Sequence, residues 1–160
     1  MAPQKQRKAQ WDEKAGPAEN AMRELPWIVA AYFNEVRTAL ARNPRAERLH
    51  PLRVSGKRLR YSLELFRPCY GPGLEERIEA LKKVQDLLGD VNDPVAARST
   101  IRKVMRPSKL RTRVERHAAA RAAEKARIFR EHWKTVFDAP GREQWWTGYL
   151  AHEAHAPDLK

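Results

Sequence analysis

Four basic side chains recur at steps of three and four residues within one short segment: His50, Arg53, Lys57 and Arg60. At about 100° per residue they lie within roughly 80° of one another on a helix. Arginine presents a planar fork of N–H donors that matches phosphate oxygens, and lysine adds a compact positive charge. Histidine adds a donor whose charge depends on pH. The spacing predicts a column of about one cation per turn, which fits a linear polyanion.

The opposite face of the same predicted helix is apolar, with Leu52, Leu59, Leu63 and Phe66 clustered together. One face therefore packs against the protein while the other presents the cations. The alternative is an ordinary solvated basic face. Glu64 favours that alternative slightly, because it can pair with Lys57 or Arg60.

Cations on other predicted helices could complete a site. Lys82 flanks the apolar stripe of the next helix, whereas Lys83 points away from it, so Lys82 is the better candidate. Arg98, Arg102 and Arg121 fall on apolar stripes, where a charge is costly unless it is paired or lines a wet groove. Their alkyl stems could instead pack while the charged ends reach water. If several helices contribute, the site is a cationic cleft.

The elements that position these residues are all helical. Apolar residues at helical spacing predict helices over about 22–43, 45 or 51 to 66, 74–88, 94–105 and 108–137, and no strand pattern occurs. We therefore expect an all-α fold, an antiparallel bundle of four or five helices.

Breaks between the predicted helices follow from local chemistry. Pro44 disfavours helix at Asn43 before it, and Gly89 is a natural C-terminal stop. Asn92 or Asp93 could cap the following helix, with Pro94 at its first position, and Ser108 could cap the last long helix. Residues 1–18 are predicted to be a disordered basic arm, 19–150 the bundle, and 151–160 a polar tail.

Composition points to a polyanionic partner. The 160 residues include 32 Lys and Arg against 20 Asp and Glu, a formal net charge of +12. DNA, RNA, an anionic membrane and polyphosphate all qualify. Cys69 is the single cysteine, which excludes an internal disulfide and a cysteine metal cluster and fits a reducing cytoplasm. The polar, basic first twenty residues are neither a secretory signal nor a membrane span.

Two segments resemble a known family. The segment from Leu49 to Phe66 resembles the signature helix of the CHAD family, the conserved histidine α-helical domain. The segment from Leu81 to Asp93 is similar to the second signature of that family, a helix ending in Leu-Gly followed by Asn-Asp. Two signatures in the right order make a strong match, over about Leu49 to Ala97.

The resemblance implies a helical bundle that binds inorganic polyphosphate in a basic groove. From the residues we expect no catalysis, metal or cofactor. The resemblance carries binding roles onto His50, Arg53, Lys57, Arg58, Arg60 and Lys82, while Tyr61 positions the helix. Some family members associate with polyphosphate granules in the cytoplasm. The family usually has two tandem halves, and this chain carries one motif, similar to the C-terminal version. We therefore expect a homodimer that rebuilds the full basic groove.

Two rival functions remain. The basic arm and the last long helix could track nucleic-acid phosphates nonspecifically, but no recognised nucleic-acid motif is found, and the aromatics are not interleaved with the basic column. Alternatively, Asp86, Asp90 and Asp93 could hold magnesium for phosphate chemistry. Capping and turn formation explain Asp90 and Asp93 more simply, and no nucleophile–base arrangement or glycine-rich phosphate loop is present.

Overall fold

The computed structural model describes residues 8–157. Five α-helices and three short helical turns follow one another along the chain, and no strand occurs within this range. The prediction of an all-α bundle is therefore confirmed. The helices are α1 (Pro17–Ala41), α2 (His50–Leu65), α3 (Pro72–Val104), α4 (Lys109–His132) and α5 (Arg142–His152). The turns are the 3-10 turns η1 (Ala46–Leu49) and η2 (Arg67–Cys69) and the π-helical turn η3 (Trp133–Phe137).

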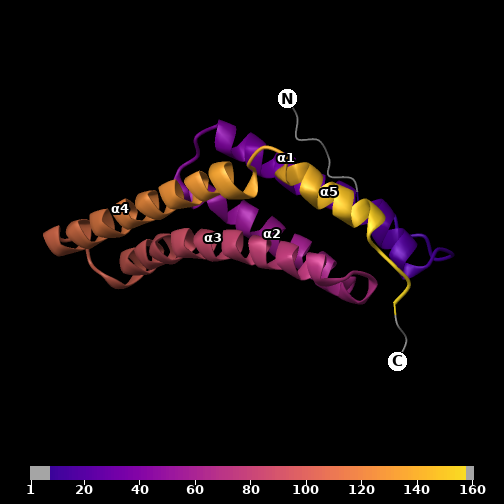
Figure 1. The fold of residues 1–160 in the computed structure, drawn as a ribbon. Coiled ribbons are helices and arrows are strands. Elements are labelled where there is room, and N and C mark those ends of the chain that lie inside the picture. The colour runs from indigo at the N-terminus through magenta and orange to yellow at the C-terminus, as the bar shows by residue number, and fades with distance from the viewer. Residues whose placement is uncertain (1–7, 158–160) are drawn as a thin grey trace.

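The helices form an elongated bundle in which α2 lies between α1 and α3 (Figure 1). α5 covers the outer side of α1, and α4 packs along α3. The α3–α4 hairpin extends beyond the other helices at its loop end (Figure 1). This projecting end therefore has less of the bundle around it than the rest of the chain.

Helix ends follow the predicted signals in two places. α1 stops at Ala41, and Asn43 adopts a left-handed φ of 45° before Pro44. Asparagine tolerates this conformation better than most residues. At the start of α4 the Ser108 hydroxyl accepts a 3.0 Å hydrogen bond from the Arg111 amide, so the predicted cap is confirmed.

α3 runs without a break through Gly89 and Pro94, where the sequence predicted the end of one helix and the start of another. That prediction is wrong. Glycine in a helix interior costs about 1 kcal/mol relative to alanine, and proline about 3 kcal/mol. Each fully buried Leu or Val stabilises by roughly 1.5–3 kcal/mol. Pro94 itself is buried, and so are the intervening apolar side chains of Leu87, Leu88 and Val91. Packing therefore outweighs the local breakers.

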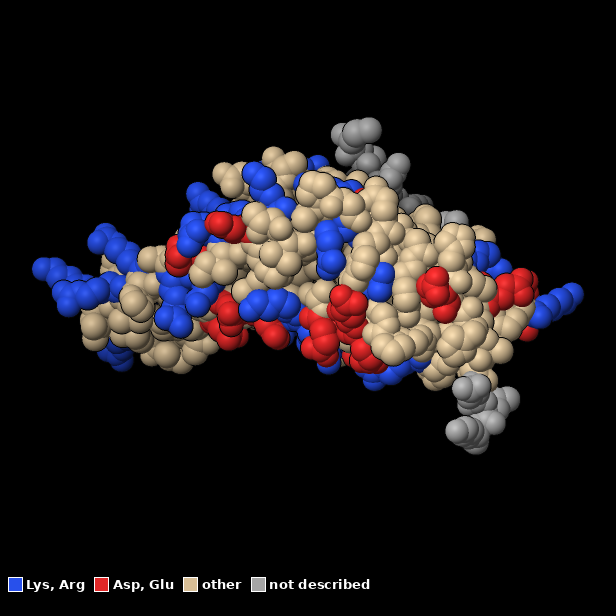
Figure 2. Space-filling model, viewed as in Figure 1, with Lys and Arg blue, Asp and Glu red and all other residues tan. Residues whose placement is uncertain are grey.

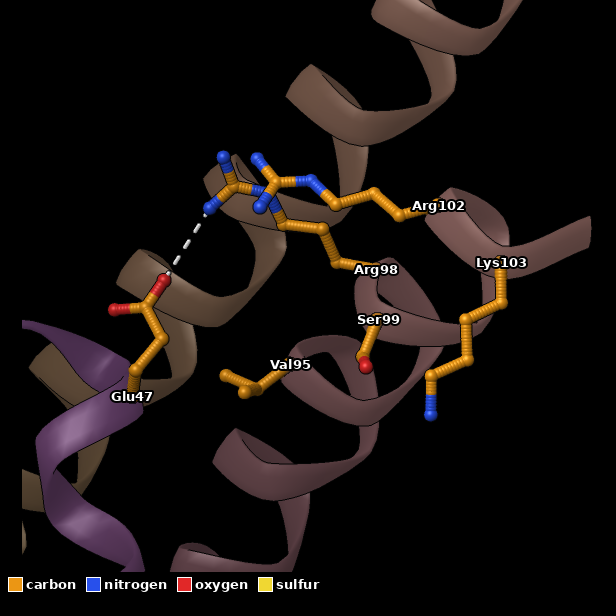
Figure 3. A pocket seen from close by; sticks show the side chains of 6 residues that line it. All are labelled: Glu47, Val95, Arg98, Ser99, Arg102 and Lys103. Carbon is orange, nitrogen blue, oxygen red and sulfur yellow. Dashed lines mark hydrogen bonds and ion pairs between the residues drawn. The ribbon is translucent and has the colours of Figure 1, made fainter. Parts of the chain in front are cut away.

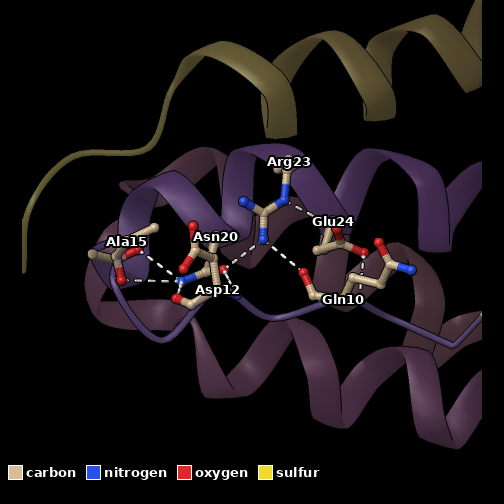
Figure 4. Close-up of polar contacts among 7 residues, drawn as sticks. Gln10, Asp12, Ala15, Asn20, Arg23 and Glu24 are labelled. Atoms are coloured by element: carbon tan, nitrogen blue, oxygen red, sulfur yellow. Dashed lines mark hydrogen bonds and ion pairs between the residues drawn. The ribbon is translucent and has the colours of Figure 1, made fainter.

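The chain ahead of α1 is held against the bundle from residue 8 on (Figure 4). The buried Asn20 amide donates to the carbonyls of Asp12, Ala15 and Gly16 and accepts from the Asp12 amide at 2.8 Å. Trp11 stacks near Phe66, with ring centroids 5.3 Å apart. The predicted disordered arm is thus replaced by an ordered segment over residues 8–16, and its last two residues, 17 and 18, lie in α1. Residues 1–7 of that prediction lie outside the described residues.

An aromatic cluster joins the C-terminal part of the chain to α1. The π-helical turn η3 rotates Trp133 and Phe137 so that their rings stack 4.7 Å apart. Both rings contact Phe33 of α1, and Phe137 also contacts the buried Trp146 of α5. Such ring pairs add roughly 0.5–1.5 kcal/mol beyond the buried area. The cluster fixes α4 and α5 against α1.

Gly56 sets how closely α2 approaches its neighbours. A Cβ at this position would lie 2.9 Å from the Tyr32 hydroxyl of α1 and 3.8 Å from the Gln85 side chain of α3. Tyr32 is buried, so its ring has little room to move aside. The absent side chain at Gly56 therefore allows α2 to seat between the two helices.

We expect Gly56→Ala to lower the free energy of unfolding by about 1–3 kcal/mol, because the added methyl overpacks against Tyr32. Gly148→Ala in α5 is the matched control, since a Cβ there meets nothing within 4 Å. It should raise stability by roughly 0.5–1 kcal/mol through helix propensity alone. Urea titration followed by circular dichroism measures both. Equal effects of the two substitutions would contradict the close approach at Gly56.

Candidate polyanion-binding site

The predicted cationic face of α2 lies opposite the buried face of the same helix. Leu52, Gly56, Leu59 and Leu63 are the buried positions. His50 is exposed in the first turn, while Arg53, Lys57 and Arg60 are half-buried. We call these four basic residues the α2 row. The predicted division of this helix into a packed face and a cationic face is confirmed.

α3 runs antiparallel to α2 and brings a further cation to the row. A Cβ at Gly89 would lie 3.9 Å from Arg53 Nε, and Gln85 faces Gly56. Each step forward along α2 is therefore a step back along α3. Continued for one turn, this register places Arg60 at the level of Lys82. By this register Lys82 lies on the side of α3 that faces the α2 row, and its role in binding stays a prediction.

The cations of this surface differ in how fully they are neutralised. Arg60 lies 3.8 Å from Glu64 and over the Tyr61 ring, and Lys82 Nζ lies 2.8 Å from Glu79. Arg53 and Lys57 form no ion pair with any residue from 8 to 157. The uncompensated charge of the α2 row is therefore concentrated on these two neighbours, one helical turn apart.

Partial burial orients the arginines of the row. The Nε atoms of Arg53 and Arg60 are buried and have no hydrogen-bond partner in the described part of the chain. Their alkyl stems therefore pack against the protein, and the polar ends reach towards water. A side chain already held by packing loses less conformational entropy when it binds an anion.

Arg58 belongs to a different surface. Its side chain lines a hollow of about 190 Å³ between α1 and α2, which is also bordered by Tyr32, Glu35 and Ser55. The Ser55 hydroxyl donates a 2.7 Å hydrogen bond to Glu35. Burial, followed by the nearby charge of Glu35, raises the pKa of the Tyr32 phenol. The structure does not place Arg58 with the α2 row, although the resemblance carried a binding role onto it.

Arg98 also lies apart from the row. It lines a hollow of about 350 Å³ at the end of α3, with its guanidinium 3.3 Å from Glu47 of η1 (Figure 3). Arg102 lies beside it and pairs with Glu115 at 3.2 Å. Arg98 and Arg102 are therefore both paired with a carboxylate and placed at the edge of a hollow, the two settings in which a cation on an apolar stripe was expected. Glu47 lies 51 residues from Arg98 in the sequence, so no helical spacing could reveal that pair.

Glu115 joins two helices through two arginines. Arg111 donates to it at 3.0 Å, and Arg102 reaches it from α3. The hydrogen bond from Arg111, reinforced by the charge of Arg102, holds the pKa of this carboxyl below its usual range. The network closes the α3–α4 hairpin on one face and leaves less free charge at Arg102.

Arg121 is exposed on α4 and is separated from the α2 row by α3. It lies on the side of α4 that carries His132, eleven residues later. Burial, followed by the charge of Lys83, lowers the pKa of His132, so the two side chains lie within electrostatic reach of each other. On α3, Lys83 and the row-facing Gly89 point about 120° apart. The structure therefore does not bring Arg121 together with Arg53 or Lys57.

The three aspartates considered as magnesium ligands are exposed inside α3. Because α3 is continuous, Asp90 and Asp93 cap no helix, and the capping interpretation is wrong. Asp86, Asp90 and Asp93 instead recur along its exposed side. Among residues 8–157, no group of three or more His, Cys, Asp and Glu side chains converges in a way that could hold a metal ion.

Charge is unevenly distributed on the surface. Figure 2 shows acidic and basic side chains mixed along much of the molecule, whereas the loop end of the α3–α4 hairpin, at the left, is basic. Within residues 8–157, no helix is both long and apolar enough to traverse a bilayer.

The structure is an all-helical bundle with a row of basic side chains on its second helix. The family model of the CHAD domain matches residues 2–102, which is more than half of the chain. The chain therefore belongs to the CHAD-domain family. The matched part runs through α1 and α2 and nearly to the end of α3, so it contains the α2 row, Lys82 and Arg98. Neither the curated proteins nor the solved structures contain a match.

The burial of His132, together with the nearby charge of Lys83, lowers the His132 pKa and makes stability depend on pH. His132 has a lowered pKa in the folded chain, so the unfolded chain takes up its proton first as pH falls through about 6.5. The free energy of unfolding should therefore decrease on acidification through this range. Lys83→Met should raise the His132 pKa and reduce the decrease, measured by NMR titration and by urea titration between about pH 5 and 7.5.

His132→Gln is the control for that measurement, because it removes the titrating group and should flatten the same part of the profile. An unchanged His132 pKa in Lys83→Met would show that the two side chains do not face one another.

Proposed function

We propose that this chain binds inorganic polyphosphate along the α2 row, with Lys82 beside it, and performs no chemistry on the ligand. The observation that carries the proposal is the pair Arg53 and Lys57, two neighbouring cations that form no ion pair with residues 8–157, within the region that matches the CHAD domain. A bound phosphate chain would supply the missing negative charge. The cytoplasm, including polyphosphate granules, is the proposed place of action.

The positions of the aromatic side chains favour a phosphate chain over a nucleic acid as the ligand. Sequence-tolerant binding of single strands uses aromatic side chains as stacking platforms. Here most aromatic rings are buried in the core, and Tyr61 is the exposed ring on α2. The Tyr61 ring is already occupied by Arg60, 5.2 Å from its centroid. The row therefore offers cations without a free stacking surface, which fits a ligand without bases.

Arg53→Gln and Lys57→Gln should each weaken polyphosphate binding by about tenfold, because each removes a charge-assisted hydrogen bond. Each should also reduce the slope of log affinity against log salt by about one. Lys82→Gln should have a smaller effect, since Glu79 already neutralises that charge. Fluorescence anisotropy with labelled polyphosphate at several salt concentrations measures all three.

Arg42→Gln is the matched control, because it removes one exposed, unpaired arginine at the end of α1. It should change affinity little. Duplex and single-stranded DNA are titrated in parallel. DNA binding as tight as polyphosphate binding at moderate salt, or an equal loss in Arg42→Gln and Arg53→Gln, would favour nonspecific polyanion binding instead.

The non-enzymatic part of the proposal has its own assay. Wild-type protein incubated with polyphosphate and magnesium should release no orthophosphate above a buffer blank. Release that disappears in Asp93→Asn, with the helical circular dichroism spectrum preserved, would identify a phosphate-processing enzyme.

We also propose that two copies associate to assemble a complete basic groove, because the chain carries one CHAD motif where the family usually has two. Light scattering coupled to size exclusion at micromolar concentration should give twice the chain mass. A monomeric mass both with and without polyphosphate would limit the proposal to the α2 row of a single chain.

A further inference from the structure

The loop end of the α3–α4 hairpin concentrates positive charge. From Arg98 to Arg113 the chain has seven basic residues and no acidic one. Glu47 and Glu115, which lie outside this stretch, neutralise part of that charge. Five cations at this end remain exposed and form no ion pair with residues 8–157: Lys103, Arg106, Lys109, Arg113 and Arg116. Figure 2 shows this basic end of the molecule.

Two large apolar side chains are exposed at the same end. Val104 is 73% exposed at the last position of α3, and Leu110 is 58% exposed at the second position of α4. A single exposed aliphatic side chain is ordinary in a soluble protein. Two on one face, surrounded by cations, form an amphipathic surface.

Helix geometry puts these side chains on one face. Arg102 of α3 pairs with Glu115 of α4 at 3.2 Å, so these two positions mark one face of the hairpin. Val104 lies about 160° from Arg102 on α3, and Leu110 lies about 140° from Glu115 on α4. Val104 and Leu110 therefore share the face opposite the Arg102–Glu115–Arg111 network.

We infer that this hairpin tip, made of Val104, Leu110 and the five unpaired cations, docks on an anionic phospholipid surface. The cations attract acidic lipid headgroups, and the two aliphatic side chains enter the boundary between headgroups and acyl chains. A hydrated polyanion such as polyphosphate or DNA would use the cations but would gain nothing from the aliphatic pair. The combination therefore favours a lipid surface.

The tip is separate from the proposed polyphosphate site. Val104 follows Gly89, which lies beneath Arg53, by fifteen residues of continuous helix, or about 22 Å. That distance exceeds two Debye lengths at physiological salt, about 8 Å each. Docking at the tip therefore leaves the α2 row free for its own ligand, and the two sites can be tested independently.

The test is flotation of the full chain with vesicles of phosphatidylcholine containing about one third phosphatidylserine, against vesicles of phosphatidylcholine alone. Wild-type protein should float with the anionic vesicles only. Val104→Ser with Leu110→Ser should weaken this binding about tenfold without changing charge. Lys109→Gln with Arg113→Gln should weaken it about 25-fold, at roughly fivefold for each cation.

Arg53→Gln with Lys57→Gln is the matched control, because it removes two cations from the other site and should leave vesicle binding unchanged. The Val104 and Leu110 double variant should still bind polyphosphate like wild type. No flotation of wild type, or full flotation of the double serine variant, would overturn the inference. A dimer that the serine variant converts to monomer would overturn it in favour of a second copy at the tip.

Discussion

The close approach of three helices at Gly56 is the constraint on which the arrangement of the basic surface depends. α2 has a neighbour on each side at this position. A Cβ at Gly56 would lie 2.9 Å from the Tyr32 hydroxyl of α1 and 3.8 Å from the Gln85 side chain of α3. Because this position admits no side chain, the rotation of α2 about its axis is fixed. In this orientation Arg53 lies over Gly89, and the α2 row lies at the surface beside α3. Gly56 lies one turn from both Arg53 and Arg60 on α2, so the packing constraint at Gly56 acts directly beside the cations that it positions.

The basic side chains fall into two groups once their partners are known. Arg98, Arg102 and Arg111 form ion pairs that connect η1, α3 and α4, so part of their charge is used in holding the hairpin together. Arg53 and Lys57 form no such ion pair with residues 8–157. A protein carrying a net charge of +12 pays for that excess in self-repulsion, and the repulsion is relieved where an anion binds. Function is therefore best sought where cations lack partners.

The sequence predicted α2 and most of α1 because their helical periodicity is strong, although α1 begins at Pro17, ahead of the predicted start near residue 22. Leu52, Leu59 and Leu63 are buried as expected, and the cations lie opposite. The predicted break between Gly89 and Pro94 is wrong because local helix propensity does not include the burial of this part of α3 against other helices. The sequence also grouped Arg98 and Arg121 with the α2 row. Helical angles report which side of a helix a residue occupies, but not which neighbour covers that side.

Because α3 continues through Gly89, where the sequence predicted its end, the α2 row and the tip of the α3–α4 hairpin are separate basic surfaces. A helix that ended at Gly89 would let the following helix turn back, and Arg98 could then reach the level of Arg53. A continuous α3 excludes that arrangement, because its residues advance by about 1.5 Å each along one axis. Arg98 is carried past the first turn of α2 to Glu47, and Val104 is carried past the bundle altogether. Burial of Leu87, Leu88, Val91 and Pro94 thus does more than stabilise the core, since it determines that the basic residues form two distant surfaces and not one cleft.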